Sequence, residues 1–161
     1  MTQRVDLATV MDRLAVDSLL TEYARALDAG DWAAFRRLFV PGGHVDHPCA
    51  EDPAEHPATD TDAVDRLAAA LAPYPTRQHF LVNRLLSFDL LEHDEGDTAR
   101  VNADYLAVLY RADGSVDAAP DVEHGGRYAF LAVRTREGWR LREALGERMW
   151  RRARTTGDSA T

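Results

Sequence analysis

The sequence contains no lysine and no isoleucine, and it has a single cysteine, Cys49. A lone cysteine excludes a disulfide within the chain and is typical of proteins from a reducing compartment. All 19 basic residues are therefore arginines, and against 27 acidic residues they leave a net charge of −8. Because nucleic-acid binding depends on a basic surface that releases counterions, this charge argues against a nucleic-acid partner.

Long apolar runs are also missing. No stretch reaches the ~18 apolar residues that a membrane span requires. Residues 1–13 carry charged side chains where a secretory signal peptide would need its apolar core. We therefore expect a cytoplasmic protein with no membrane partner.

The 161 residues, of which 45% are hydrophobic and 29% charged, suffice for one globular domain with a core of its own. We assign residues 1–150 to this domain and residues 151–161 to a disordered basic and polar tail. Residues 48–59 contain several prolines among acidic residues, which indicates a loop.

Helical patterns come first along the chain. Apolar residues recur at helical spacing from Asp6 to Asp28, and similar patterns predict a short helix over Asp31–Val40 and another over Thr61–Ala72. Pro41–Gly43 should end the second helix and turn the chain before a short strand at His44–His47.

Strand patterns dominate the second half of the chain. Four runs separated by turn sequences are Gln78–Leu91, Ala99–Arg111, Gly125–Thr135 and Trp139–Gly146. Helices followed by antiparallel strands indicate an α+β fold in which a curved sheet wraps around the helices.

Asp28 stands at the edge of the helix face that should point inward, since Leu20 and Ala24 precede it at helical steps of four. Burying a carboxylate without a partner is costly, so an acid here needs a hydrogen-bonding neighbour or a chemical function. Alternatively, Asp28 only marks the helix end before Gly30, or it caps the short helix that begins at Asp31.

Several motifs resemble the SnoaL-like group of the NTF2-like superfamily. They are Tyr-Ala-x-x-Leu-Asp-x-Gly-Asp-Trp-x-x-Phe-x-x-Leu-Phe at Tyr23–Phe39, Thr-x-x-His at Thr76–His79, and Gly-Gly-Arg-Tyr at Gly125–Tyr128 ahead of Gly-Trp-Arg at Gly138–Arg140. Enzymes of this superfamily include scytalone dehydratases, bile-acid dehydratases, polyketide cyclases and ketosteroid isomerases. The resemblance implies a cone-shaped sheet, open at one end, with a pocket for a small hydrophobic ligand beside the long helix.

The resemblance also implies a catalytic pair. Scytalone and bile-acid dehydratases hold a histidine against an aspartate at the positions that His79 and Asp28 match here. An ionised aspartate orients the imidazole and fixes its tautomer, so that the histidine can take a proton from carbon beside a carbonyl and return it to a leaving hydroxyl. Without the resemblance, a single histidine near the end of an element is more often structural than catalytic.

Four further residues are candidates for the same pocket. Tyr23 matches a tyrosine of the bile-acid dehydratases, and its phenol is a suitable donor to a substrate carbonyl. His47 falls where both dehydratase groups have a second tyrosine, unless it is only a loop histidine. Asn102 and Tyr128 are candidate substrate-binding residues that alternatively satisfy buried polar atoms. Scytalone dehydratases have a tyrosine directly before the aspartate, whereas this chain has Leu27.

We expect no cofactor and no metal. The chain has no glycine-rich phosphate loop, no nucleophile elbow and no dinucleotide fingerprint. The spacing of His44, Asp46, His47 and His56 matches no zinc signature. The expected function is that of a cofactor-independent dehydratase or isomerase for a hydrophobic oxygenated small molecule, such as a polyketide or steroid-like intermediate. The alternatives are a polyketide cyclase of the same superfamily and a non-catalytic binding or assembly domain.

Alternation also predicts which sides of the strands face the core. In Gln78–Leu91 one side is mixed and carries His79, whereas the other is mostly apolar and should fill the core. That apolar side consists of Phe80, Val82, Leu86 and Phe88. In Ala99–Arg111 we expect the apolar side to pair with a second copy, since the resemblance implies a homodimer or higher homo-oligomer. That side consists of Val101, Ala103, Tyr105, Ala107 and Leu109.

Overall fold

A computed structural model describes residues 6–48, 61–113 and 119–154. Its helices are α1 (Leu7–Ala29), α2 (Trp32–Arg37) and α3 (Thr61–Leu71). Its strands are β1 (Phe39–Asp46), β2 (Thr76–Leu90), β3 (Thr98–Tyr110), β4 (Val122–Thr135) and β5 (Gly138–Ala153). None of the described helices is long and apolar enough to cross a membrane.

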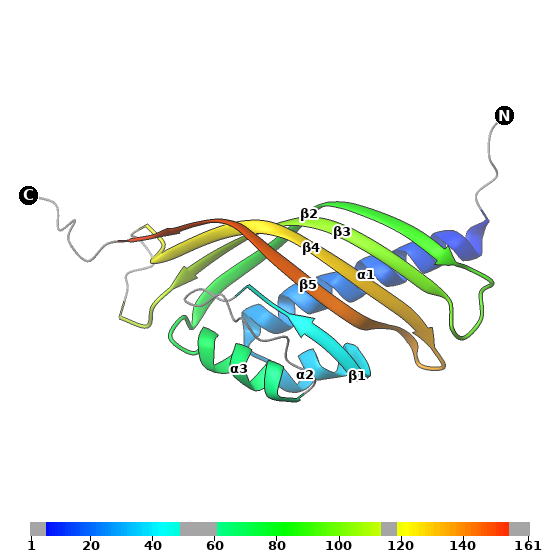
Figure 1. The fold of residues 1–161 in the computed structure, drawn as a ribbon, viewed down its shortest axis with the longest axis horizontal. Coiled ribbons are helices and arrows are strands. Elements are labelled where there is room, and N and C mark those ends of the chain that lie inside the picture. Colours follow the sequence, from blue (N-terminus) through cyan, green and yellow to red (C-terminus); the bar gives the residue numbers. More distant parts are fainter. Residues whose placement is uncertain (1–5, 49–60, 114–118, 155–161) are drawn as a thin grey trace, which may run out of the picture.

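The five strands form one sheet in the order β1-β5-β4-β3-β2. Neighbouring strands are antiparallel, except that β1 runs parallel to β5. Figure 1 shows the sheet arching over α1, with α2 and α3 beside β1. The predicted α+β fold, with a curved and unclosed sheet around the N-terminal helices, is confirmed.

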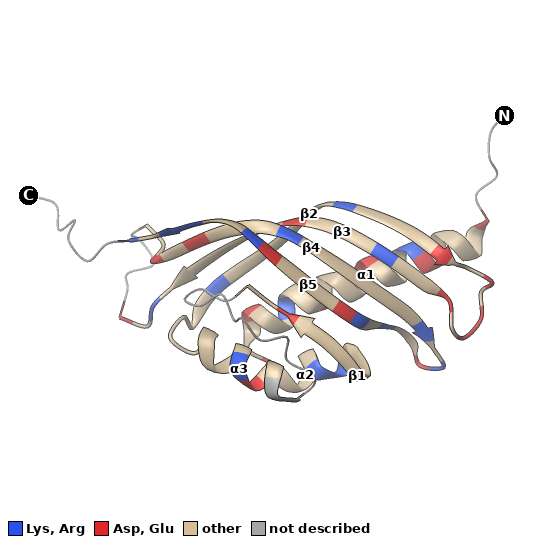
Figure 2. Cartoon of the chain, in the orientation of Figure 1, with Lys and Arg blue, Asp and Glu red and all other residues tan. Residues whose placement is uncertain are grey.

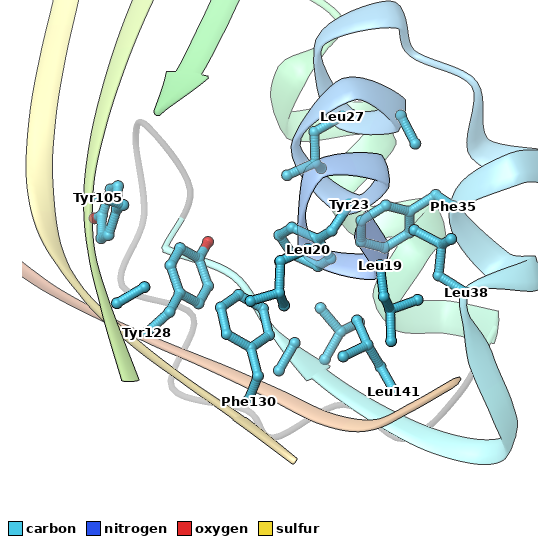
Figure 3. Packing of buried hydrophobic residues seen from close by; sticks show 14 of the residues in the cluster. Leu19, Leu20, Tyr23, Leu27, Phe35, Leu38, Tyr105, Tyr128, Phe130 and Leu141 are labelled. Carbon is cyan, nitrogen blue, oxygen red and sulfur yellow. The ribbon is translucent and has the colours of Figure 1, made fainter. Parts of the chain in front are cut away.

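The hydrophobic core fills the space between α1 and the inner side of the sheet. Buried and exposed residues alternate along β3, as expected for a strand with one covered side. Tyr105, Tyr128 and Phe130 come from the sheet (Figure 3). Tyr23 on α1 packs edge-on against Phe130, with ring centroids 5.3 Å apart. Other α1 residues at helical spacing complete this part of the core, namely Val16, Leu19, Leu20 and Leu27.

The side of β3 that we predicted to form a dimer interface is the core side. Its five residues are at most 3% exposed: Val101, Ala103, Tyr105, Ala107 and Leu109. That prediction was wrong because this apolar side covers the helix. Exposed apolar side chains remain on the outer side of the sheet, among them Phe80, Val82, Leu106 and Trp150. A dimer formed through the sheet would have to use that outer side.

A β-bulge in β2 changes which side of the strand faces the core. The pairing of β2 with β3 shifts register between Val82 and Leu85. Before the bulge His79 is buried, whereas Phe80 and Val82 are 40% and 46% exposed. After the bulge Phe88 packs against the core. The predicted core side was therefore wrong for the first half of the strand, because the one extra residue reverses the alternation.

Pro41–Gly43 lie within β1 and do not end the second helix as predicted. The helix already ends at Arg37, and the strand begins at Phe39. The pairing of β1 with β5 shifts register between Phe39 and His44, so the proline and the glycines occupy an irregular part of the strand.

The C-terminal boundary of the folded region also differs from the prediction. Residues 151–153 continue β5 and do not belong to a disordered tail. Residues 155–161, and the predicted loop from residue 49 onward, lie outside the described residues. Figure 2 shows acidic and basic residues interspersed along the strands, with a basic end to β5.

A buried ionic cluster fixes the N-terminal half of α1 to the sheet. Arg134 on β4 lies 2.6 Å from Asp12 of α1 and 3.1 Å from Asp97, measured between side-chain nitrogen and oxygen. Asp12 also accepts a hydrogen bond from Trp139 Nε1 at 3.2 Å, and its other oxygen lies 3.0 Å from His93 Nδ1. Burial alone would raise the pKa of Asp12, but the hydrogen bonds from Arg134, Trp139 and His93 lower it.

Removing the cation of this cluster should destabilise the fold strongly. Arg134→Met leaves the buried carboxylates of Asp12 and Asp97 without their shared partner, so we expect the free energy of unfolding to fall by about 3–5 kcal/mol. Arg136→Met is the control, because Arg136 is 89% exposed and pairs only at the surface with Glu95, and it should cost less than about 0.5 kcal/mol. Urea unfolding measures both, and equal losses would contradict this role of Arg134.

We expect a homodimer in solution. Sedimentation equilibrium should give about twice the 17.9 kDa of one chain. Leu106→Glu places a charge on the outer side of the sheet, and a dimer that uses this side should then dissociate. A wild-type mass near 17.9 kDa at micromolar concentration would contradict the expectation.

Candidate active site

Asp28 lies in the last turn of α1. The helix ends at Gly30, whose positive φ of 66° lets its backbone N–H donate back into that turn. The α2 helix has its own cap, since the side chain of Asp31 accepts a hydrogen bond from Ala34 N at 2.8 Å. Asp28 is therefore not needed as a cap, and its carboxylate is directed to another partner.

That partner is His79, at the start of β2. The backbone N–H of His79 donates to both carboxylate oxygens of Asp28, at 3.0 and 3.2 Å, and Nδ1 lies 2.8 Å from Oδ1. The predicted contact between the two residues is present. Because a carboxylate accepts, Nδ1 carries a proton, and in the neutral imidazole Nε2 then has the lone pair. This Nε2 is buried and has no hydrogen-bond partner in the described part of the chain.

Arg77 fixes the end of α1 in the position that the contact between Asp28 and His79 requires. It precedes His79 by two residues and so lies on the same side of β2. Its Nε donates to the carbonyl of Leu27 at 2.8 Å. Its Nη1 donates to the carbonyls of Leu71 and Tyr74, at 3.2 and 2.8 Å. The guanidinium thus joins the ends of two helices to the first residues of β2, a role that was not predicted although Arg77 is part of the Thr-x-x-His motif.

Tyr23, His47 and Tyr128 form a second polar group beside this pair. Both phenol oxygens lie within hydrogen-bonding distance of His47 Nδ1, that of Tyr23 at 3.2 Å. The rings of His47 and His79 are 5.3 Å apart between centroids. Burial lowers the pKa of His47 well below its usual value, and the nearby His79 and His124 lower it further. His47 is therefore a buried neutral imidazole directly after β1.

Two glycines give Tyr128 its place in this group. A Cβ on Gly126 would lie 1.9 Å from the carbonyl oxygen of Glu147, so only glycine allows β4 and β5 to approach here. Gly146 lies opposite Tyr128 in β5, and a Cβ there would lie 2.8 Å from the tyrosine ring and 2.4 Å from Pro48. A side chain at Gly146 would displace the ring that contacts His47, and one at Gly126 would push β5 away from β4.

His124 is a third buried histidine and was not predicted from the sequence. It is 1% exposed, and its Nδ1 lies 3.1 Å from the phenol oxygen of Tyr105. Its Nε2 is buried without a hydrogen-bond partner among the residues described. Burial lowers the pKa of His124 to about 4, assisted by the nearby positive groups. Its alternation with Gly126 and Tyr128 along β4 is the signal that indicates an inward position.

The structure does not bring Asn102 to these residues. Asn102 is exposed on the outer side of β3, in a surface hollow of about 440 Å³ that Asn83, Asp104 and Arg127 also line. Of the six residues predicted for the site, Asn102 is thus the one that lies on the opposite side of the sheet.

His44, Asp46 and His47 do not form a metal site in the described structure. In residues 6–48, 61–113 and 119–154, no three histidine, cysteine, aspartate or glutamate side chains are grouped so that they could hold a metal ion. His56 lies outside these ranges.

Known proteins share this fold, and a family model matches most of the chain. The family model described as a SnoaL-like domain matches residues 8–144, whereas a search of curated proteins finds no match. A candidate scytalone dehydratase from Novosphingobium aromaticivorans superposes with a TM-score of 0.71 at 17% identity, over 92% of this chain and 91% of that chain.

Two further solved structures are similar. A candidate dehydratase of the NTF2-like family from Streptomyces avermitilis has a TM-score of 0.68 at 16% identity, over 88% of this chain and 99% of that chain. The hexachlorocyclohexane dehydrochlorinase LinA-type3 from Novosphingobium barchaimii has a TM-score of 0.70 at 12% identity, over 95% of this chain and 96% of that chain. These similarities show a shared NTF2-like fold, and the family match over most of the sequence shows that the chain belongs to the SnoaL-like domain family.

Proposed function

We propose that the protein is a cofactor-independent dehydratase or isomerase that moves a proton next to a carbonyl group of a hydrophobic, oxygenated small molecule. The observation that carries this proposal is the 2.8 Å contact between Asp28 and His79 Nδ1. It leaves a buried Nε2 with a lone pair and no partner among the described residues. The dehydratase and dehydrochlorinase names of similar structures are consistent with a lyase-type reaction.

His79 acts as the general base of this reaction. Its Nε2 takes a proton from the carbon beside the carbonyl, and the electron pair of that C–H bond forms a C=C bond as the carbonyl oxygen becomes an enolate. In a dehydratase, the enolate re-forms the carbonyl and expels the hydroxyl of the next carbon, which leaves as water with the proton from His79. In an isomerase, the same proton returns to a different carbon. Asp28 stabilises the imidazolium by its charge.

Tyr23, His47 and Tyr128 supply polar contacts in an otherwise apolar interior. Because the phenol of Tyr23 contacts His47 Nδ1, Tyr23 acts on the substrate through His47. His47 is neutral and lies beside the ring of His79. We assign His47 and Tyr128 to binding of a substrate oxygen near the carbon that loses its proton.

Proton removal can be tested before the natural substrate is known. In D₂O, the α-proton NMR signals of 2-tetralone and of bicyclic β-hydroxy ketones should decay faster with the protein than without it. His79→Ala should lower this exchange rate by roughly 10² to 10⁴. Asp28→Asn should cost nearly as much, because an amide cannot stabilise the imidazolium by charge.

His44→Ala is the matched control, because His44 on β1 is half-buried and outside the cluster, and it should retain full exchange. Mass spectrometry of the β-hydroxy ketones separates loss of water from isomerisation or ring closure. Exchange that survives in His79→Ala would refute the assignment of His79 as the base.

The phenol of Tyr23 should contribute less than the base does. Tyr23→Phe removes one hydrogen bond to His47, and we expect the exchange rate to fall by about 10². Tyr110→Phe is the control, since Tyr110 lies at the end of β3 outside this cluster. A loss for Tyr23→Phe as large as that for His79→Ala would contradict this smaller contribution of the tyrosine.

A further inference from the structure

His79 and His124 stand in one row across the inner side of the sheet. His79 on β2 is paired with Ala107 on β3, and Ala107 is paired with His124 on β4. All three are buried, at 7%, 0% and 1% exposed. Two steps across a sheet separate the outer Cα atoms by about 10 Å. In this row only the methyl group of Ala107 stands between the two imidazoles.

The partners of the two Nδ1 atoms give these imidazoles opposite tautomers. Asp28 accepts a hydrogen bond from His79 Nδ1, so Nε2 of His79 carries a lone pair. Burial raises the pKa of Tyr105, so its phenol keeps its proton and can donate it to His124 Nδ1, which lies 3.1 Å away. With the phenol as the donor, the single N–H of a neutral His124 lies on Nε2, and the proposal below takes this arrangement.

His124 stays neutral at physiological pH. Burial is the main reason that its pKa falls to about 4, and the charges of His79, Arg148 and Arg151 act in the same direction. A buried N–H without an acceptor is costly, and such a group in a native protein is commonly explained by a ligand or a functional role. His124 Nε2 is such a group within the described chain.

We propose that His124 is a second catalytic residue, which donates its Nε2–H to the carbonyl oxygen of the substrate that His79 deprotonates. The proposal rests on the proposed function of His79. As Nε2 of His79 takes the proton, the C–H electron pair forms the C=C bond and negative charge moves to the carbonyl oxygen, where the N–H of His124 stabilises it. Tyr105 is the positioning residue that fixes the tautomer.

This arrangement also defines the class of substrate. The molecule must present an acidic C–H to one histidine and a carbonyl oxygen to the other while its body lies over Ala107. Because His124 is a neutral donor, it recognises the oxygen of a neutral ketone. A flat cyclic ketone meets these conditions, since a single rigid ring can present an acidic C–H and a carbonyl oxygen to two separate groups.

Long-range ¹H–¹⁵N NMR spectra of the imidazoles at neutral pH test the tautomers in the free protein. We expect the Nδ1–H form for His79 and the Nε2–H form for His124. Tyr105→Phe should remove the preference in His124 and leave the spectrum of His79 unchanged. An Nδ1–H form or a doubly protonated ring at His124 in the wild type would overturn the proposal.

A second measurement uses 2-naphthol, a flat ring with one oxygen, as the probe. Its binding should shift the Nε2 resonance of His124, and His124→Leu should weaken binding about tenfold. His124→Gln keeps an N–H donor and should lose less. His124→Leu should also slow the α-proton exchange of 2-tetralone by about 10². The proposal is overturned if 2-naphthol binds equally to wild type and His124→Leu, or leaves His124 unperturbed at millimolar concentration.

The same variants separate this proposal from the function on which it rests. If exchange depends on His79 while neither exchange nor 2-naphthol binding depends on His124, the base is retained and the donor role of His124 is refuted. If exchange persists in His79→Ala while 2-naphthol binding still depends on His124, the base assignment is refuted and the donor remains as a ligand-binding group.

Discussion

Asp28 occupies the last turn of α1, where the negative end of the helix dipole disfavours a carboxylate by roughly 0.3–1 kcal/mol. The backbone N–H and Nδ1 of His79 offset this cost, since hydrogen bonds to a charged group each contribute about 1.5–3 kcal/mol. Arg77 donates a hydrogen bond to the adjacent carbonyl of Leu27. All these donors come from the first residues of β2, so together they fix the position of the end of α1 relative to this strand. The contact that joins them also orients the imidazole.

The opposite half of α1 is held by a second polar contact, between Asp12 and Arg134. Because both halves of α1 are fixed to the sheet, the distance from the sheet to the helix residues between them is also fixed. Tyr23 is one of these residues, and its phenol must come within hydrogen-bonding distance of His47. Such contacts weaken within a few tenths of an ångström. The ionic cluster is remote from His47, yet it contributes to the geometry there because both act on the same helix.

Local patterns were sufficient to predict the long helix, α3 and the four strands that follow it, because the spacing of apolar residues is a local property. The pairing of Asp28 with His79, 51 positions apart, was accessible only through a family resemblance. Two failed predictions concern pairing between distant segments, namely the bulge of β2 and the covered side of β3. The parallel pairing of β1 with β5 was not predicted at all. Alternation along β4 indicates that His124 points inward, but it does not reveal that His79 lies two strands away.

The neighbour of Nδ1 decides what Nε2 can do in each of these histidines. In the proposed mechanism, a carboxylate accepts the Nδ1 proton of His79 and leaves Nε2 as a base, whereas a phenol donates to Nδ1 of His124 and leaves an N–H on Nε2. Removing a proton beside a carbonyl requires both, because the charge that forms on oxygen in a low-dielectric interior needs a donor already in place. A protonated His124 would disfavour the imidazolium that forms on His79. The burial that lowers the pKa of His124 therefore also favours proton transfer to its neighbour.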